Sequence, residues 1–114
     1  MENCLFCKIA EGTIPSKKVY EDEQVLAFYD INEQAPVHVL LIPKKHIESV
    51  MEVEREDDAL ICHLVHVAQK LALQLGLSEN GFRLVLNTGA YGGQTVMHMH
   101  IHILGGRYMS WPPG

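Results

Sequence analysis

The chain has 114 residues, which corresponds to a single domain spanning residues 1–114. Its formal net charge of −5 argues against a nucleic-acid-binding protein, because such proteins usually present a basic surface. No run of about 18 apolar residues is present that would span a membrane. The cysteines number 3, and an odd number argues against the disulfide framework of a secreted protein. We therefore expect a cytoplasmic protein whose partners are neither membranes nor nucleic acids.

The first half of the chain predicts short elements. Residues 3–10 have the pattern of a short helix, which Gly12 and Pro15 would end. Two short strands joined by a charged turn follow, and the β-branched run before Pro43 predicts a buried strand. These strands are expected at residues 17–21, 24–29 and 37–42, with a loop over residues 30–36.

The second half contains one long helix, predicted over residues 57–75. Its apolar residues recur at spacings of four and three, and Gly76 is placed to end it. Further apolar residues beside this stripe predict that the helix is buried on two sides. Two more strands are predicted at residues 82–88 and 97–104. The fold class is therefore α+β, an antiparallel sheet of about five strands with one long and one short helix.

Three histidines alternate with apolar residues near the end of the chain, at His98, His100 and His102. If this segment is a strand, the three side chains share one face at intervals of about 7 Å, and the intervening residues point into the core. A row of imidazoles at this spacing can surround one phosphate, with ring nitrogens that attack, donate a hydrogen bond or carry a proton. Two alternatives are a polar strand face that happens to be histidine and a catalytic zinc site with three histidine ligands.

A glycine-rich segment, residues 89–96, lies directly before the histidines. Glycines allow backbone N–H groups to approach an anion closely, and Thr95 adds a hydroxyl donor. The chain contains no Asp or Glu after Glu79, so no carboxylate from this part repels an anionic ligand. Together these features predict a phosphate-binding loop.

At these residues the chain resembles the histidine triad family, and within it the nucleotide-binding branch of purine nucleoside phosphoramidases. The family motif is His-φ-His-φ-His-φ-φ, with φ apolar, and residues 98–104 match it at every position. The resemblance also extends over most of the chain. The segments that carry it are Ile14-Pro15, Phe28-Tyr29-Asp30-Ile31, Gln34-Ala35-Pro36, Ile42-Pro43-Lys44-Lys45-His46, Gly92-Gly93-Gln94-Thr95, Leu104-Gly105-Gly106-Arg107 and Trp111-Pro112-Pro113-Gly114.

The resemblance implies hydrolysis of the P–N bond of purine nucleoside 5′-phosphoramidates, with adenosine preferred. It implies that His100 is the nucleophile, which forms a nucleotidyl-histidine intermediate that water then cleaves. It implies that His102 hydrogen-bonds the phosphate and assists proton transfer to the leaving nitrogen. His98 completes the triad, and Thr95 contacts the phosphate or the leaving group. Asn87 and Gly93 are implied as further groups on the phosphate side.

The same resemblance implies where the nucleoside lies. Asp30 is expected to accept hydrogen bonds from the ribose hydroxyls. Trp111 lies in a C-terminal segment that reaches the partner's site in a homodimer of two joined sheets; the two-sided apolar helix independently favours such a dimer. The apolar lining of the nucleoside pocket is expected to consist of Leu5, Phe6, Ile9, Phe28 and Ile31.

The Cys4-x-x-Cys7 pair predicts either a redox pair or half of a zinc site. The absence of a thioredoxin-like pattern in a cytoplasmic protein favours zinc over a redox pair, and two reduced cysteines without a metal are the remaining alternative. The resemblance places His46 beside His98 near the N-terminal segment. The implied site is a structural Zn²⁺ held by these four residues, with no cofactor required for catalysis. His38, by contrast, is interpreted as an ordinary strand residue.

Two other functions remain open at this stage. The first is hydrolysis of dinucleoside polyphosphates by the same triad. The second is a nucleotide-binding regulatory protein whose catalysis is incidental.

Overall fold

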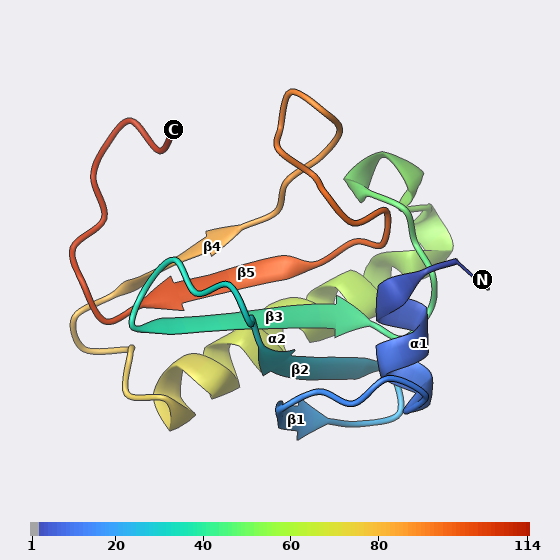
Figure 1. The fold of residues 1–114 in the computed structure, drawn as a ribbon, viewed down its shortest axis with the longest axis horizontal. Helices are drawn as coiled ribbons and strands as arrows, with labels where there is room; N and C mark the ends of the chain where they lie inside the picture. Colours follow the sequence, from blue (N-terminus) through green and yellow to red (C-terminus); the bar gives the residue numbers. More distant parts are fainter. Residues whose placement is uncertain (1–2) are drawn as a thin grey trace.

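The computed structural model describes residues 3–114, which form one sheet with a helix on each face (Figure 1). The strands are all antiparallel and lie in the order β1-β2-β3-β5-β4. The predicted α+β class, with one long and one short helix, is confirmed. The elements are α1 (Leu5–Glu11), β1 (Lys18–Glu21), β2 (Val25–Tyr29), β3 (Val37–Pro43), α2 (Asp58–Gln74), β4 (Phe82–Val85) and β5 (Ile101–Gly105), with short 3-10 turns at Val50–Glu52 and Arg55–Asp57.

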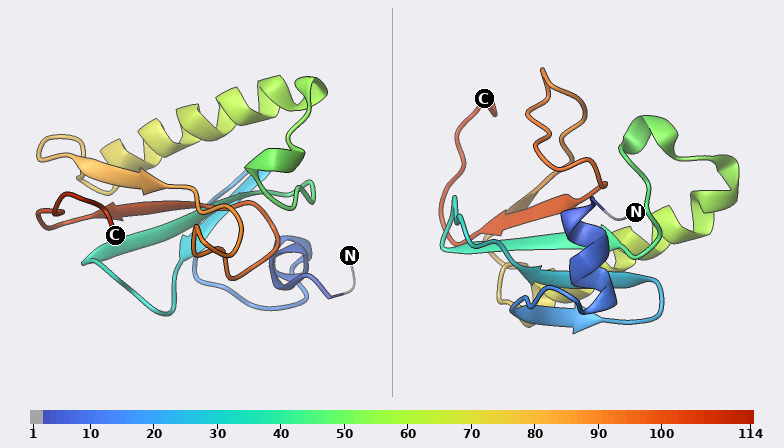
Figure 2. Two further views of the ribbon diagram at one scale, coloured as in Figure 1. Left: turned by 90° about the horizontal axis from the view of Figure 1, so that it is seen from above. Right: turned by 45° about the vertical axis from the view of Figure 1, so that its right-hand side comes forward.

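The alternation of side chains along β2 and β3 divides the core into two layers. Val25, Ala27, Val39 and Leu41 face α2 and pack against its apolar stripe. The intervening residues face α1 and pack against Phe6 and Ile9, and Figure 2 shows the two helices on opposite sides of the sheet. The residues of β2 and β3 in this second layer are Leu26, Phe28, Leu40 and Ile42.

Local sequence explains where the two helices begin and end. The Sγ of Cys4 caps α1 by accepting a hydrogen bond from the Cys7 N–H at 3.3 Å, and Gly12 ends the helix in the left-handed region at φ 86°. A reciprocal capping box between Glu54 and Asp57 precedes α2, which Gly76 follows at φ 74°. None of the helices described in residues 3–114 is long and apolar enough to cross a membrane.

Two strands are shorter in the structure than the sequence predicts. β4 ends at Val85 instead of residue 88, and β5 begins at Ile101 instead of residue 97. The chain bends before β5 because the Met99 N–H donates to the Ile47 carbonyl at 2.6 Å, outside the sheet ladder. His98 and His100 therefore precede the strand that carries His102.

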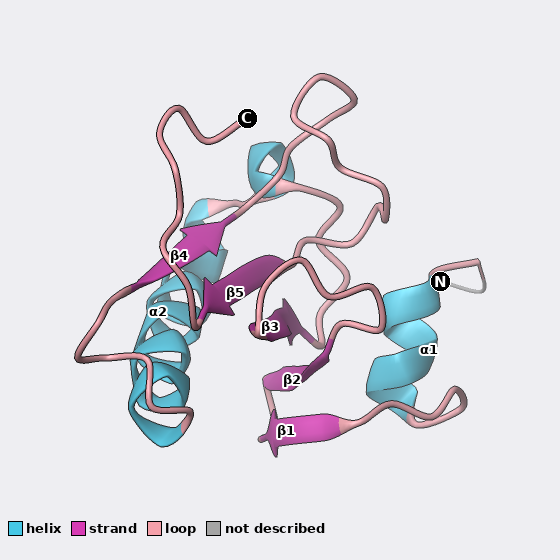
Figure 3. Ribbon diagram, turned by 60° about the vertical axis from the view of Figure 1, so that its left-hand side comes forward, coloured by secondary structure: helices cyan, strands magenta, loops and turns pink. Residues whose placement is uncertain are grey.

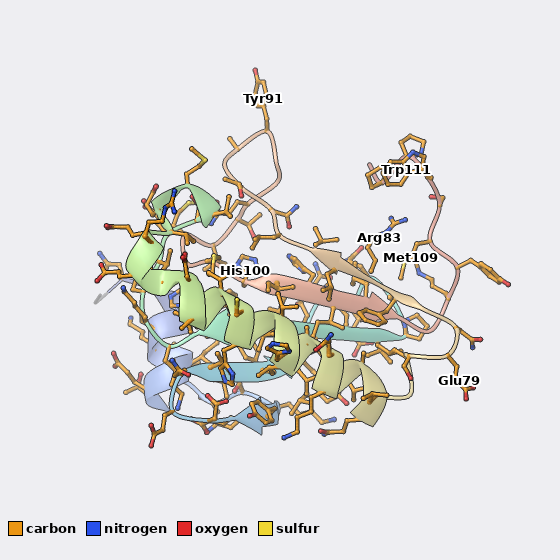
Figure 4. The ribbon with its side chains drawn as sticks, turned by 180° about the vertical axis from the view of Figure 1, so that it is seen from behind. Glu79, Arg83, Tyr91, His100, Met109 and Trp111 are labelled. Atoms are coloured by element: carbon orange, nitrogen blue, oxygen red, sulfur yellow. The ribbon has the colours of Figure 1, made fainter. Side chains whose placement is uncertain are left out.

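The last nine residues, 106–114, form an irregular segment that turns back beside β4 after β5 ends (Figure 3). Arg83 of β4 fastens this segment by donating from Nη2 to the Ser110 carbonyl at 2.9 Å. Trp111 remains 82% exposed and projects away from the sheet (Figure 4). Within one chain, this indole has no apolar layer to pack against.

Candidate active site

The three histidines do not form the single row on one strand that alternation predicts. His98 lies in a bend, fully buried, and its ring packs against His46 with the ring centroids 5.0 Å apart. His100 and His102 do lie together, with ring centroids also 5.0 Å apart. The prediction of a shared face is confirmed, because Phe6 of α1 lies edge-on to both His98 and His100, whereas Met99, Ile101 and Ile103 pack in the α2 layer. Only the assignment of His98 and His100 to the strand was wrong. His100 and His102 are thus adjacent on the α1 face of the sheet.

Hydrogen bonding fixes which nitrogen of His100 carries the proton. Its Nδ1 lies 2.7 Å from the carbonyl oxygen of His98. A carbonyl only accepts, so Nδ1 is the protonated nitrogen and Nε2 keeps its lone pair. Phe6 of α1 stands edge-on to the imidazole at a centroid distance of 5.0 Å and restricts its rotation. The ring is thus held in the tautomer whose Nε2 lone pair is available for attack on an electrophile.

The proton position on His102 is set by a second chain of hydrogen bonds. The Gln34 N–H donates to His38 Nδ1 at 3.0 Å, so His38 carries its proton on Nε2. That Nε2 lies 2.9 Å from His102 Nδ1 and donates to it. His102 therefore carries its own proton on Nε2. His38 is a site residue that sequence reasoning assigned to ordinary strand structure, and its signal was its alternation with Leu40 and Ile42 on the α1 face.

The surroundings of His38 and His102 keep these two rings neutral. The pKa of His102 is lowered to about 4, chiefly by burial and also by the neighbouring His100 and His38, while Asp30 acts in the opposite direction. Burial also lowers the pKa of His38. Neutral rings with defined tautomers match the hydrogen-bond chain, which requires one donor and one acceptor on each imidazole.

Three potential metal-ligand atoms, from Asp30, His38 and His102, also lie close enough together to suggest a cation site. A metal on His38 Nε2 would require the ring proton on Nδ1, where it would meet the Gln34 N–H. The carboxylate oxygen of Asp30 lies 3.4 Å from His38 Nε2, and its other oxygen accepts from the Asn32 N–H at 2.8 Å. These three residues therefore fit a hydrogen-bond chain and not a metal centre.

The glycine-rich segment forms a tight loop beside the histidines. Gly92 has no room for a side chain, since a Cβ there would lie 2.3 Å from the Thr88 carbonyl oxygen. Asn87 closes the loop by donating from Nδ2 to the Gly92 carbonyl at 2.7 Å. Gly93 adopts φ 81°, and Thr95 is exposed and lines a cavity of about 600 Å³. The predicted phosphate-side residues are thus brought together on one loop.

The residues predicted to line the nucleoside pocket separate into two groups in the structure. Phe6, Ile9 and Phe28 pack together in the layer beneath α1, with the Phe6 and Phe28 ring centroids 5.6 Å apart. Leu5 and Ile31 lie outside this layer, at 45% and 103% exposure. Three of the five residues are thus buried in one apolar layer, whereas Leu5 on α1 and Ile31 in the loop after β2 are exposed, and their contact with a nucleoside stays a prediction.

A second cluster joins Cys4, Cys7, His46 and His98. The Nδ1 atoms of the two histidines are 3.2 Å apart, and His98 Nδ1 lies 3.3 Å from the Sγ of Cys4 and 3.5 Å from that of Cys7. The Sγ of Cys7 is 3.3 Å from His46 Nδ1. The structure thus brings together all four residues that sequence comparison with the family singled out.

An antiparallel sheet with a helix on each face, and a His-x-His-x-His segment entering its β5 strand, defines a histidine triad protein. The chain belongs to the HIT family, whose HIT domain matches residues 11–109. It is 54% identical over 113 residues to an uncharacterized HIT-like protein of Synechocystis sp., covering 99% of this chain and 98% of that protein.

Solved structures give the same result. The chain is similar to a HIT family hydrolase from Legionella pneumophila, with 55% identity, a TM-score of 0.97 and coverage of 98% of this chain and 100% of that one. It is also similar to a histidine triad nucleotide-binding protein from Candida albicans, with 34% identity, a TM-score of 0.84 and coverage of 96% and 83%.

Proposed function

We propose that the protein hydrolyses purine nucleoside 5′-phosphoramidates, preferring adenosine, with His100 as the nucleophile. The observation that carries this proposal is the fixed tautomer of His100, whose Nδ1–H is held by the His98 carbonyl at 2.7 Å while Nε2 keeps its lone pair. Relatives described as a HIT family hydrolase and as a histidine triad nucleotide-binding protein support the reaction class and the ligand class.

The proposed reaction has two steps. In the first, His100 Nε2 bonds to the α-phosphorus as the P–N bond to the amine breaks. In the second, water attacks phosphorus and the bond to Nε2 breaks, which frees the nucleoside monophosphate. Over the cycle, water supplies the hydroxyl that phosphorus keeps and the proton that the amine keeps. The Nε2–H of His102 donates a hydrogen bond to the phosphate and assists proton transfer to the leaving nitrogen.

The residues around this pair have supporting roles in the proposal. Gly93, Asn87 and Thr95 hold the phosphate on the loop, and Asp30 accepts from the ribose hydroxyls. Phe6, Ile9 and Phe28 form the apolar side of the nucleoside pocket. Leu5 and Ile31 border it from positions that are exposed in the single chain.

Steady-state kinetics over a panel of substrates tests the function. We expect kcat/KM for an adenosine phosphoramidate to exceed that for a diadenosine polyphosphate by about a hundredfold or more, and to exceed that for the guanosine phosphoramidate. Mass spectrometry of acid-quenched protein with a slow substrate should detect an adenylylated His100. A preference for the dinucleoside polyphosphate would assign the chain to that reaction instead, and nucleotide binding without turnover would support a regulatory role.

We also propose that Cys4, Cys7, His46 and His98 hold a structural zinc ion. Donors at zinc–sulfur and zinc–nitrogen bond lengths around one tetrahedral ion lie about 3.3–3.7 Å from each other, close to the separations of this cluster. His98 Nε2 donates to the Pro43 carbonyl at 2.7 Å, so its Nδ1 lone pair faces the two sulfurs. The ion would fasten α1 over the apolar layer and leave no open position for catalysis.

Finally, we propose that two chains form a homodimer through β4 and α2. β4 is an edge strand of the sheet, so its outer backbone groups are free to pair with another strand. Leu84 of β4 is 44% exposed, and Val65 and Leu73 of α2 are 48% and 69% exposed. Such a dimer would bury this apolar face and give Trp111 a partner surface near the other chain's site.

A further inference from the structure

The side chain of Gln94 is the most completely hydrogen-bonded polar group of the glycine-rich loop. It is buried, with 7% of its surface exposed, although Gly93 and Thr95 on either side of it are exposed. Its Nε2 donates to the Glu48 carbonyl at 2.7 Å and to the Val96 carbonyl at 3.0 Å. Its Oε1 accepts from the Gly89 N–H at 3.0 Å. All three partners are backbone groups.

These three bonds join parts of the chain that no sheet pairing connects. Gly89 and Val96 are the two ends of the loop, so the amide joins both ends, in addition to the backbone bond from the Gln94 N–H to the Gly89 carbonyl at 3.0 Å. Glu48 belongs to the segment after β3, 46 residues away. The neighbouring Ile47 carbonyl accepts from the Met99 N–H at 2.6 Å, so this segment is itself fastened to the residues that carry His98 and His100.

We infer that Gln94 is a positioning residue, which holds the phosphate-binding loop at a fixed distance from His100. Its amide hydrogen-bonds backbone groups only, and neither His100 nor His102, so it acts through the backbone of residues 89–96. The inference rests on the proposed function, because the loop matters to catalysis only if it binds the phosphate. Catalysis by His100 and His102 depends on other hydrogen bonds, from the His98 carbonyl and from His38.

The chemistry of the side chain is specific. Only a primary amide of this length donates twice and accepts once at these positions. A carboxylate would place an anionic oxygen against the Glu48 and Val96 carbonyls, with no proton to donate. Gln94→Glu is therefore a nearly isosteric test, and Gln94→Ala removes the amide without adding a charge.

The experiment compares Gln94→Glu and Gln94→Ala with Gln74→Glu, which adds the same charge at an exposed position of α2. We expect the affinity for adenosine monophosphate, measured by calorimetry, to fall at least tenfold in both Gln94 variants and not in Gln74→Glu. We expect KM to rise more than kcat falls, since the two catalytic histidines keep their hydrogen bonds. A variant that merely unfolded in part would lose kcat and keep KM.

Hydrogen exchange of the free protein gives a measurement that needs no substrate. The Gly89 amide, which donates to Gln94, should exchange at least tenfold faster in Gln94→Ala, while amides of β3 keep their protection. Unchanged exchange and unchanged nucleotide affinity would overturn the assignment. If wild type binds the nucleotide but cleaves no phosphoramidate, the proposed reaction is wrong, whereas the exchange and affinity results still decide the role of Gln94.

Discussion

His38 Nε2 lies 2.9 Å from His102 Nδ1, although the two histidines are 64 residues apart and belong to the neighbouring strands β3 and β5. The backbone N–H of Gln34 decides the tautomer of His38, and His38 in turn decides that of His102. One loop amide therefore determines that the Nε2 of His102 carries an N–H and not a lone pair.

Replacing His38 should impair catalysis without impairing binding. In His38→Leu, His102 is free to adopt the other tautomer, and we expect kcat to fall about tenfold to a hundredfold. In His38→Gln the amide N–H still reaches His102 Nδ1, so kcat should recover in large part. Single-turnover kinetics together with calorimetric affinity for adenosine monophosphate measures both effects. A wild-type kcat in His38→Leu would refute the role of this histidine.

Replacing His100 by Asn should abolish turnover and spare the fold. Without Nε2 no nucleotidyl-enzyme forms, so we expect the rate to fall by about three orders of magnitude or more. Nucleotide affinity should persist, since the loop and the apolar layer remain. Residual activity above a few per cent of wild type would mean that another group attacks phosphorus.

Stability should fall as the pH decreases from about 6.5 to about 4. The pKa of His102 is about 4 in the folded chain against its ordinary 6.5, so in this window the unfolded chain binds a proton that the folded chain does not. The contribution of His102 to the free energy of unfolding is therefore fully present above about pH 6.5. It decreases by about 3 kcal/mol as the pH falls to about 4. Denaturant unfolding at several pH values measures the slope.

His102→Gln should reduce this slope, whereas His66→Gln, at an exposed position of α2, should leave it unchanged. Burial lowers the pKa of His38 as well, so part of the slope should persist in His102→Gln. Equal slopes in wild type and in His102→Gln would show that His102 does not titrate in this way.

Elemental analysis should find about one zinc per chain in protein purified without a histidine tag or chelator. The double variant Cys4→Ser/Cys7→Ser should lose the metal and unfold at a lower temperature, because only apolar packing, chiefly by Phe6 and Ile9, then holds α1. Cys62→Ser, at an exposed position of α2, is the matched control and should keep the metal. Wild-type protein without zinc would exclude the proposed ion.

Sedimentation at micromolar concentration should show a dimer. Leu84→Glu places a charge on the exposed face of the β4 edge and should shift the equilibrium toward monomer by at least tenfold. Met51→Glu changes an exposed apolar residue elsewhere, at 76% exposure, and should have no effect. A wild-type monomer would leave the apolar face of β4 and α2 without the partner we propose.

Periodicity predicted the elements well because it depends on local burial. The stripe of α2 and the alternation of β2 and β3 follow directly from which side chains face the core. The start of β5 was missed because His98 and His100 alternate with apolar residues as strand residues do. Their bend is caused by partners far away in the chain, Ile47 for the backbone and Cys4 for the side chain.

The supporting residues of the site were harder to find for the same reason. His38 matters because β3 pairs with β5, and Gln94 because its amide meets the Glu48 carbonyl of the segment after β3. The alternation of His38 with Leu40 and Ile42 indicates its face, but no periodic signal reveals the partner of His38 or of Gln94. The motif singled out His100, whereas the groups that orient the site became visible only in three dimensions.

Residue 98 contributes to the two centres through different parts of its structure. Its imidazole faces the cysteines, but it is its carbonyl oxygen that holds His100, and every amino acid supplies that oxygen. A descendant that lost Cys4 and Cys7 would therefore be free to vary the side chain at position 98 while the ring of His100 kept its orientation. Substitutions change the cysteine–histidine cluster through its side chains, whereas the orientation of His100 depends on the path of the main chain, so the two can evolve independently.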